Sequence, residues 1–138
     1  MPANENVIPK RFTAYIGGYT GHSYRVRFDG YVFTYSASER CLKDWVTEEL
    51  EVTEADWAEF RAALDCVDAW GWKKSYFSEE CDGTGWDLHL KYEDRAIKCH
   101  GRNSAPEENG EEKFPETSKL FGRYLAAVSQ LAGGRRFA

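Results

Sequence analysis

Residues 24–35, Tyr-Arg-Val-Arg-Phe-Asp-Gly-Tyr-Val-Phe-Thr-Tyr, decide the fold. Apolar and polar side chains alternate on both sides of Asp29-Gly30, as they do in strands with one buried face. Asp-Gly between two alternating runs is a strong hairpin signal, because glycine adopts the positive φ that a tight turn needs. The stretch therefore predicts two antiparallel strands that share one apolar face, made by Tyr24, Val26, Phe28, Tyr31, Phe33 and Tyr35.

A third strand precedes this hairpin. Phe12, Ala14 and Ile16 alternate with Thr13 and Tyr15, and the glycine-rich run that follows can reverse the chain. A glycine-rich loop can also hold a phosphate, but that function needs a helix N-terminus directly after it, and here a strand follows. The first 35 residues are therefore expected to contain a three-stranded antiparallel meander.

A fourth strand and a helix are expected next. Residues 46–52 alternate imperfectly, which favours a strand, and Thr53 followed by Asp56 has the spacing of a helix N-cap. Apolar residues then recur every three or four positions, so they share one face of a helix that runs to about Ala69 and stops at Gly71. That face consists of Trp57, Phe60, Leu64 and Val67.

The C-terminal half predicts a second hairpin and a second helix. Residues 86–92 alternate clearly, Glu93-Asp94 turns the chain, and residues 95–100 return. The last helix begins near Thr117 or Ser118 and ends at Gly133-Gly134. Its expected buried residues are Leu120, Tyr124, Ala127, Val128 and Leu131.

These elements predict an α+β fold in a single domain, residues 1–138. We expect an antiparallel sheet of about five to six strands, in the order meander, helix, hairpin, helix, with the two helices packed on one face. A chain of 138 residues has the size of one ordinary domain. Residues 1–10 and 135–138 are expected to be loose tails, and residues 101–117 a long polar loop.

The charge is acidic and unevenly distributed. The formal net charge is −5, and residues 41–70 carry nine acids against Lys43 and Arg61. The favoured interpretation of this segment is the solvated side of a strand and a helix, and the alternative is a surface for a basic partner. An acidic chain does not favour broad binding to phosphate backbones, so nucleic acid is not the expected partner.

Location and cofactors are predicted from what the sequence lacks. No apolar run approaches the roughly 20 residues that cross a bilayer, and the N-terminus has no signal-peptide pattern, so a cytoplasmic protein is expected. The four cysteines are expected to be free thiols, with a disulfide between Cys81 and Cys99 as the less favoured alternative. His22, His89 and His100 show no zinc-type spacing, and no nucleophile motif is present, so we predict no catalytic residue, metal or cofactor.

Aromatic residues give the most specific signal. Trp70, Trp72, Tyr76, Phe77 and Trp86 fall within seventeen positions. The favoured interpretation is a set of rings that closes one end of the core, and the alternative is a binding surface, because Trp and Tyr are enriched in interface hot spots. Stacking of exposed aromatic rings on single-stranded nucleic acid, together with Arg25 and Arg27, ranks third because the chain is acidic.

Several motifs occur in a fixed order: Trp70-x-Trp72, Asp82-Gly83-Thr84-x-Trp86-x-Leu88, Gly101-x-Asn103-x-x-Pro106 and Leu131-x-Gly133-Gly134-Arg135. In this order they resemble a group of small bacterial proteins with no established activity. The likeness covers most of the chain, although members often carry Tyr where this chain has Ala105. The resemblance implies no catalytic residue.

Two loops define the candidate site. The loop before the strand at residue 86 and the loop after the strand at residue 100 should lie at the same end of the second hairpin, because the two strands are antiparallel. The candidate binding residues are Trp72, Tyr76, Asp82, Thr84, Trp86, Arg102 and Asn103. A structural role is the alternative, since Asp and Asn side chains often bond their own turns.

Aromatic and acidic features without catalytic geometry favour a non-enzymatic protein-interaction module. We expect an accessory, immunity or inhibitor protein of a bacterial system, with another protein, of basic character, as its partner. The alternative is a small enzyme or ligand-binding protein with its site at the Asp82/Asn103 end of the second hairpin.

Overall fold

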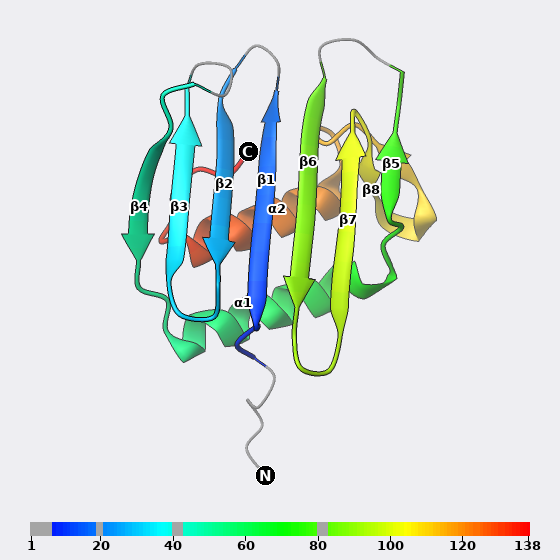
Figure 1. Cartoon of the computed structure of the whole chain (residues 1–138). Coiled ribbons are helices and arrows are strands. Elements are labelled where there is room, and N and C mark those ends of the chain that lie inside the picture. The colour runs from blue at the N-terminus through cyan, green and yellow to red at the C-terminus, as the bar shows by residue number, and fades with distance from the viewer. Residues whose placement is uncertain (1–6, 19–20, 40–42, 80–82) are drawn as a thin grey trace.

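A computed structural model describes residues 7–18, 21–39, 43–79 and 83–138. Figure 1 shows one broad sheet with both helices, α1 and α2, packed against the same face. The strand order is β4-β3-β2-β1-β6-β7-β5. The main elements are β1 (Arg11–Gly18), β2 (Ser23–Phe28), β3 (Phe33–Ser38), β4 (Val46–Leu50), α1 (Glu54–Cys66), β5 (Ser75–Phe77), β6 (Thr84–Lys91), β7 (Ala96–Arg102) and α2 (Lys119–Leu131).

The predicted α+β class is confirmed, but the predicted strand number is wrong. The sheet has seven strands rather than five to six, and its pairing is mixed, because β5 runs parallel to β7. The missed strand β5 has only three residues, too few to show an alternating pattern. It forms because the chain, after α1, passes along the edge of β7, where Ser75, Tyr76 and Phe77 lie opposite residues 100–102.

The strand β1 joins the two halves of the sheet. It pairs with β2 on one side and with β6 on the other, so Ile16 lies opposite both Tyr24 and Trp86. The β1–β6 ladder brings together residues far apart in the sequence, for example Tyr15 and Asp87. The meander and the second hairpin therefore form one continuous surface.

The first hairpin has a longer turn than expected. Phe28 pairs with Phe33, so residues 29–32 form the turn, and Tyr31 is 92% exposed rather than on the apolar face. The Asp29 carboxylate accepts hydrogen bonds from the backbone N–H groups of Tyr31 and Val32, both at 2.9 Å. These two hydrogen bonds from the Asp29 side chain stabilise the longer turn.

The helix α1 begins as predicted and ends earlier. Thr53 is the N-cap, and its side chain and that of Asp56 each accept a hydrogen bond from the other residue's backbone N–H, which makes a capping box. The helix ends at Cys66 rather than near Ala69, because Asp68 adopts a left-handed conformation with φ of 50°. A short 3-10 turn, η1 (Ala69–Gly71), follows and includes the glycine that was predicted to stop the helix.

Two groups of rings fill the core between the sheet and the helices. Trp57 of α1 contacts the rings of Phe12, Phe28, Phe33 and Phe60. At the other end, Trp86 contacts Trp72, Tyr76 and Phe121. Of the predicted buried residues of α2, Tyr124, Val128 and Leu131 are buried, Leu120 and Ala127 are partly buried, and Phe121 and Leu125 are buried although not predicted.

Residues 135–138 pack against the sheet and are not a loose tail. Phe137 is 2% exposed, and the Tyr35 hydroxyl donates to the Arg136 carbonyl at 2.6 Å. Arg135 forms an ion pair with Glu48 of β4 at 3.0 Å. In the N-terminal segment, the Lys10 N–H donates to the Lys91 carbonyl at 2.7 Å, so the chain is already held in the sheet just before β1.

Residues 101–117 are more ordered than a long polar loop. They contain the end of β7, a small hairpin of β8 (Ala105–Pro106) and β9 (Glu112–Lys113), and the short turn η2 (Glu108–Gly110) between them. Glu107 is buried and accepts hydrogen bonds from the Lys119 and Leu120 N–H groups at the start of α2. A carboxylate in this position complements the N-terminal end of the helix dipole.

Candidate functional site

The residues predicted to form one binding site lie on different sides of the sheet. Tyr76 and Trp86 lie on the covered face and are 5% and 3% exposed, and Trp72 packs beside them, partly buried. The Trp86 Nε1 donates to the Ser104 carbonyl at 2.9 Å, and the Trp72 Nε1 donates to the Val67 carbonyl at 3.2 Å. These three rings belong to the core, in line with the interpretation that they close one end of it.

The other predicted site residues lie at the strand ends or on the opposite face. Asn103 is 2% exposed, has a φ of 58°, and donates from Nδ2 to the Ser78 carbonyl at 3.4 Å. The Thr84 hydroxyl donates to Glu116. Arg102 is exposed on the face away from the helices, and Asp82 lies outside the described residues. The structure thus brings the rings together but not the full predicted set.

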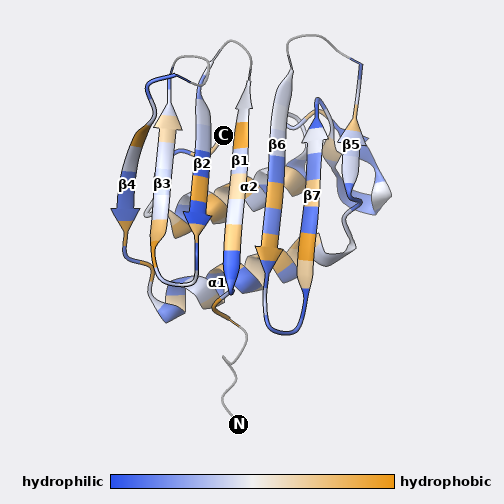
Figure 2. Ribbon diagram, viewed as in Figure 1, coloured by the Kyte–Doolittle hydropathy of each residue, from blue (hydrophilic) through white to orange (hydrophobic). Residues whose placement is uncertain are grey.

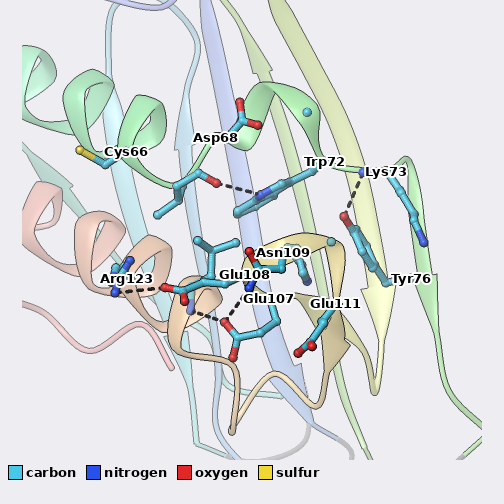
Figure 3. A pocket seen from close by; sticks show the side chains of 15 residues that line it. Cys66, Asp68, Trp72, Lys73, Tyr76, Glu107, Glu108, Asn109, Glu111 and Arg123 are labelled. Carbon is cyan, nitrogen blue, oxygen red and sulfur yellow. Dashed lines mark hydrogen bonds and ion pairs between the residues drawn. The ribbon is translucent and has the colours of Figure 1, made fainter.

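A pocket of about 460 Å³ lies beside the start of α2, next to Trp72 and Tyr76 (Figure 3). Its polar groups are largely used to fix the 107–111 segment and the chain around η1. The N–H groups of Leu120, Lys119 and Glu108 hold the pKa of Glu107 down to about 2. Arg123 pairs with Glu108 at 3.4 Å, and the Lys73 N–H donates to the Tyr76 hydroxyl at 2.9 Å. We interpret this pocket as structural.

The face of the sheet opposite the helices, which we call the open face, carries the alternate residues of every strand. Hydrophobic and hydrophilic residues alternate along β7 in Figure 2, and the register of the ladders assigns the polar set to the open face. Among the described strand residues, the open face carries six cations against two carboxylates. The cations are Arg11, Arg25, Arg27, Lys91, Lys98 and Arg102, and the carboxylates are Glu49 and Asp87.

Two adjoining hollows lie on the open face and share Tyr15 and Asp87. One has a volume of about 580 Å³ and is lined also by Arg25, Arg27 and Trp45. The other has a volume of about 360 Å³ and lies toward the loop end of β6 and β7. Its lining includes Gly17, Gly18, Gly83, Gly85, Gly101, His100 and Arg102.

Aromatic and charged groups meet in the larger hollow. The Arg25 guanidinium lies 4.5 Å from the centre of the Trp45 ring, a cation–π contact that holds both side chains at the surface. Burial raises the pKa of Asp87, while Arg25 and His100 act in the opposite direction. The hollow therefore offers an aromatic ring, two guanidinium groups and one carboxyl group whose pKa is raised.

Gly17 and Gly85 are paired across a ladder, but the fold requires glycine at only one of these two positions. Gly17 lies opposite Gly85 in the β1–β6 ladder. A Cβ at Gly17 would lie 2.2 Å from the Ser23 Oγ, so packing requires glycine there. A Cβ at Gly85 would meet nothing closer than 3.9 Å, and its φ is not in the left-handed region, so neither packing nor backbone conformation requires glycine there. An unneeded glycine inside a strand is typical of a place where a ligand approaches the backbone.

The titratable groups of the described residues show no metal centre. Within the described ranges, no three His, Cys, Asp or Glu side chains gather closely enough to hold a metal ion. Cys66 and Cys99 are free thiols, the former exposed and the latter buried, and burial raises the pKa of Cys99 to about 12. Cys41 and Cys81 lie outside the described residues. Neither described helix has the length and apolar character that crossing a lipid bilayer requires.

We identify the open face, centred on Tyr15, Trp45, Gly85 and Asp87, as the candidate binding site. Sequence reasoning missed these four residues, although the polar sides of the strands at 24–28 and 96–102 contain the signal, with a cation at almost every second position. No protein-family model matches the chain, and no match was found among curated proteins.

Proposed function

We propose that the protein is a non-enzymatic interaction module that binds a partner rich in negative charge on its open face. The observation that carries this proposal is the separation of charge across the sheet. Among the described strand residues, the open face holds six cations against two carboxylates, although the whole chain has a net charge of −5. The excess of acids therefore lies away from the open face, and a negative partner would meet a locally positive surface.

The acidic segment 41–70, which suggested a basic partner, gives weaker support for binding. Several of its acids already have partners within the chain. Glu48 pairs with Arg135, Glu59 accepts from Gln130 Nε2 at 3.1 Å, and Asp65 accepts from Trp70 Nε1 at 2.7 Å. Asp56 belongs to the capping box. These contacts favour a structural and solvating role for the segment.

The cations of the open face have fewer such partners. Within the described residues, Arg27, Lys98 and Arg102 form no ion pair, whereas Arg61 and Arg135 on the covered side are bound by Asp94 and Glu48. Cations that stay unpaired are available to neutralise an incoming partner. We therefore place the partner over β2, β1, β6 and β7.

Retention of the protein on immobilised heparin, a sulfated polyanion, tests this proposal. We expect Arg25→Glu/Arg27→Glu to elute at clearly lower salt than the unchanged protein. Lys119→Glu/Arg123→Glu, which makes the same change of net charge on α2, is the matched control and should elute near the unchanged protein. Equal shifts for both variants, or no retention of the unchanged protein at low salt, would count against the open face as a binding surface.

A second candidate function has one observation in its favour. The hollow of about 360 Å³ lies at the loop end of β6 and β7, where a ligand-binding or enzymatic site was expected, and it is lined by Arg102, His100 and Asp87. Its volume lies within the range of small-molecule sites. A rise in melting temperature on addition of inorganic phosphate that Arg102→Ala removes and Arg27→Ala preserves would favour this function over the interaction module.

A further inference from the structure

We infer that the partner of the open face is single-stranded nucleic acid, an inference that rests on the proposed function and specifies its ligand. The strand register arranges the open face in rows that cross the sheet, and each row carries a different chemistry. Strands lie about 4.8 Å apart, and successive rows on one face lie about 6.8 Å apart, so the rows form a regular platform.

The first row provides two separated cations. Arg27, Thr13, His89 and Lys98 lie side by side on β2, β1, β6 and β7, and the row continues through Thr34 of β3 to Glu49 of β4. Arg27 and Lys98 are thus three strands apart, about 14 Å. Cations at that separation, with Thr13 and His89 between them, can contact phosphates on the two edges of a strand that crosses the sheet.

The second row provides rings. Arg25, Tyr15, Asp87 and His100 are neighbours in this row, and Trp45 packs against Arg25 in the larger hollow. Aromatic rings on an open sheet are the platform on which unpaired bases stack, and this stacking does not depend on the base. A polyanion without bases, such as heparin, would make no use of these rings.

The third row provides open backbone at Gly85 beside a cation and another ring. Gly85 and Arg102 are adjacent on β6 and β7, and Phe77 of β5 lies next to Arg102 with 63% of its surface exposed. Because the glycine at 85 is not needed for the fold, the open backbone there points to a planar group that lies against it. A base over Gly85, with Arg102 near its phosphate, satisfies both features.

An acidic protein partner explains the charge but not the rest of the surface. Carboxylates on a protein would pair with Arg27, Lys98 and Arg102 and would require neither the exposed Phe77 ring nor the open backbone at Gly85. Double-stranded nucleic acid has its bases stacked and paired, so it cannot use the rings either. The whole-chain charge, which ranked nucleic acid low, does not describe this face.

Fluorescence anisotropy tests the inference with labelled oligo-uridine and oligo-thymidine of about 12 nucleotides, a length within the range that one small domain covers. We expect binding at about 50 mM salt that weakens steeply toward about 200 mM. Trp45→Ala and Gly85→Val should each weaken oligonucleotide binding by about ten-fold, the usual loss when one base loses its stacking partner. Trp45→Phe, which keeps a ring, should restore most of the affinity.

Heparin retention of the same variants separates this inference from the proposed function. We expect Trp45→Ala and Gly85→Val to lower the salt of elution from heparin much less than Arg25→Glu/Arg27→Glu does, since they keep every cation. A protein that is retained on heparin but does not bind either oligonucleotide, or binds it equally after Trp45→Ala, overturns the nucleic-acid inference and leaves the interaction module, with an acidic protein as its ligand. If the unchanged protein neither binds the oligonucleotides nor is retained on heparin, the proposed function itself is overturned.

Discussion

The covered face and the open face are made by alternate residues of the same strands, and they differ in what their aromatic rings contact. On the covered face, Trp86 is 3% exposed, contacts Trp72 and Phe121, and donates its N–H to a backbone carbonyl. On the open face, Trp45 is only partly buried, and its described ring contact is the Arg25 guanidinium. The difference teaches that the same type of ring can stabilise the core on one face and stay accessible for the proposed binding on the other.

The largest expected effect that tests this comparison is the loss of a covered ring. Trp86→Ala should lower the free energy of unfolding by about 3–5 kcal/mol, because it leaves a cavity among packed rings. Trp45→Ala, the matched variant on the open face, should cost about 0.5–1 kcal/mol, the range of an exposed cation–π contact. Urea denaturation followed by far-UV circular dichroism measures both. Similar losses for the two variants would remove the distinction between the faces.

An intermediate effect is expected at the paired glycines. Gly17→Ala should destabilise the protein by about 1–3 kcal/mol, because the new Cβ overlaps Ser23 and the Tyr15 hydroxyl. Gly85→Ala should instead raise the free energy of unfolding by about 0.5–1 kcal/mol, since alanine restricts the unfolded chain more and meets no obstacle in the strand. Thermal denaturation compares them. A destabilised Gly85→Ala would mean that glycine there serves the fold.

The smallest effect is a difference in pH dependence between two acids. The folded state lowers the pKa of Glu107 to about 2, so the stability that Glu107 contributes is present above its usual pKa of about 4.5 and is lost as pH falls toward 2. The folded state raises the pKa of Asp87, so its ionised form costs stability at neutral pH, and that cost disappears in acid.

The two corresponding amide variants should therefore change stability with opposite signs. Glu107→Gln should be less stable than the unchanged protein at pH 7, with a difference that shrinks as pH falls from 5 toward 2. Asp87→Asn should be slightly more stable at pH 7, with a gain that vanishes in acid. Midpoints of urea denaturation measured across this pH range give both differences, and a Glu107→Gln deficit that stays constant with pH would contradict the assigned role of the carboxylate.

The sequence predicted the elements whose cause is local. Alternation at residues 12–16 and 86–92 predicted β1 and β6, and the Thr53/Asp56 spacing predicted the capping box that begins α1. Gly133 and Gly134 both have positive φ and end α2, as expected. In each case the controlling contacts lie within a few positions of the pattern.

Features decided by distant contacts were not predictable. The short strand β5 exists only because β7 offers it an edge, and the docking of Phe137 depends on the covered face being complete. The candidate site has the same origin. Alternation shows that Arg25 and Arg27 oppose an apolar side, but it does not show that β6 lies next to β1 and so brings Asp87 and Gly85 to the same face as Tyr15.

The ladder between β1 and β6 also affects the order of folding. The meander and the second hairpin consist of sequence neighbours and can form early, whereas the β1–β6 ladder closes a long loop and carries the entropy cost of that closure. Mutations that weaken the hairpins or this ladder should therefore slow folding, because both are formed by the time the two halves have joined. Tyr15 and Asp87 face each other across the ladder, so the proposed binding surface does not exist in any partly folded state in which the two halves are still apart.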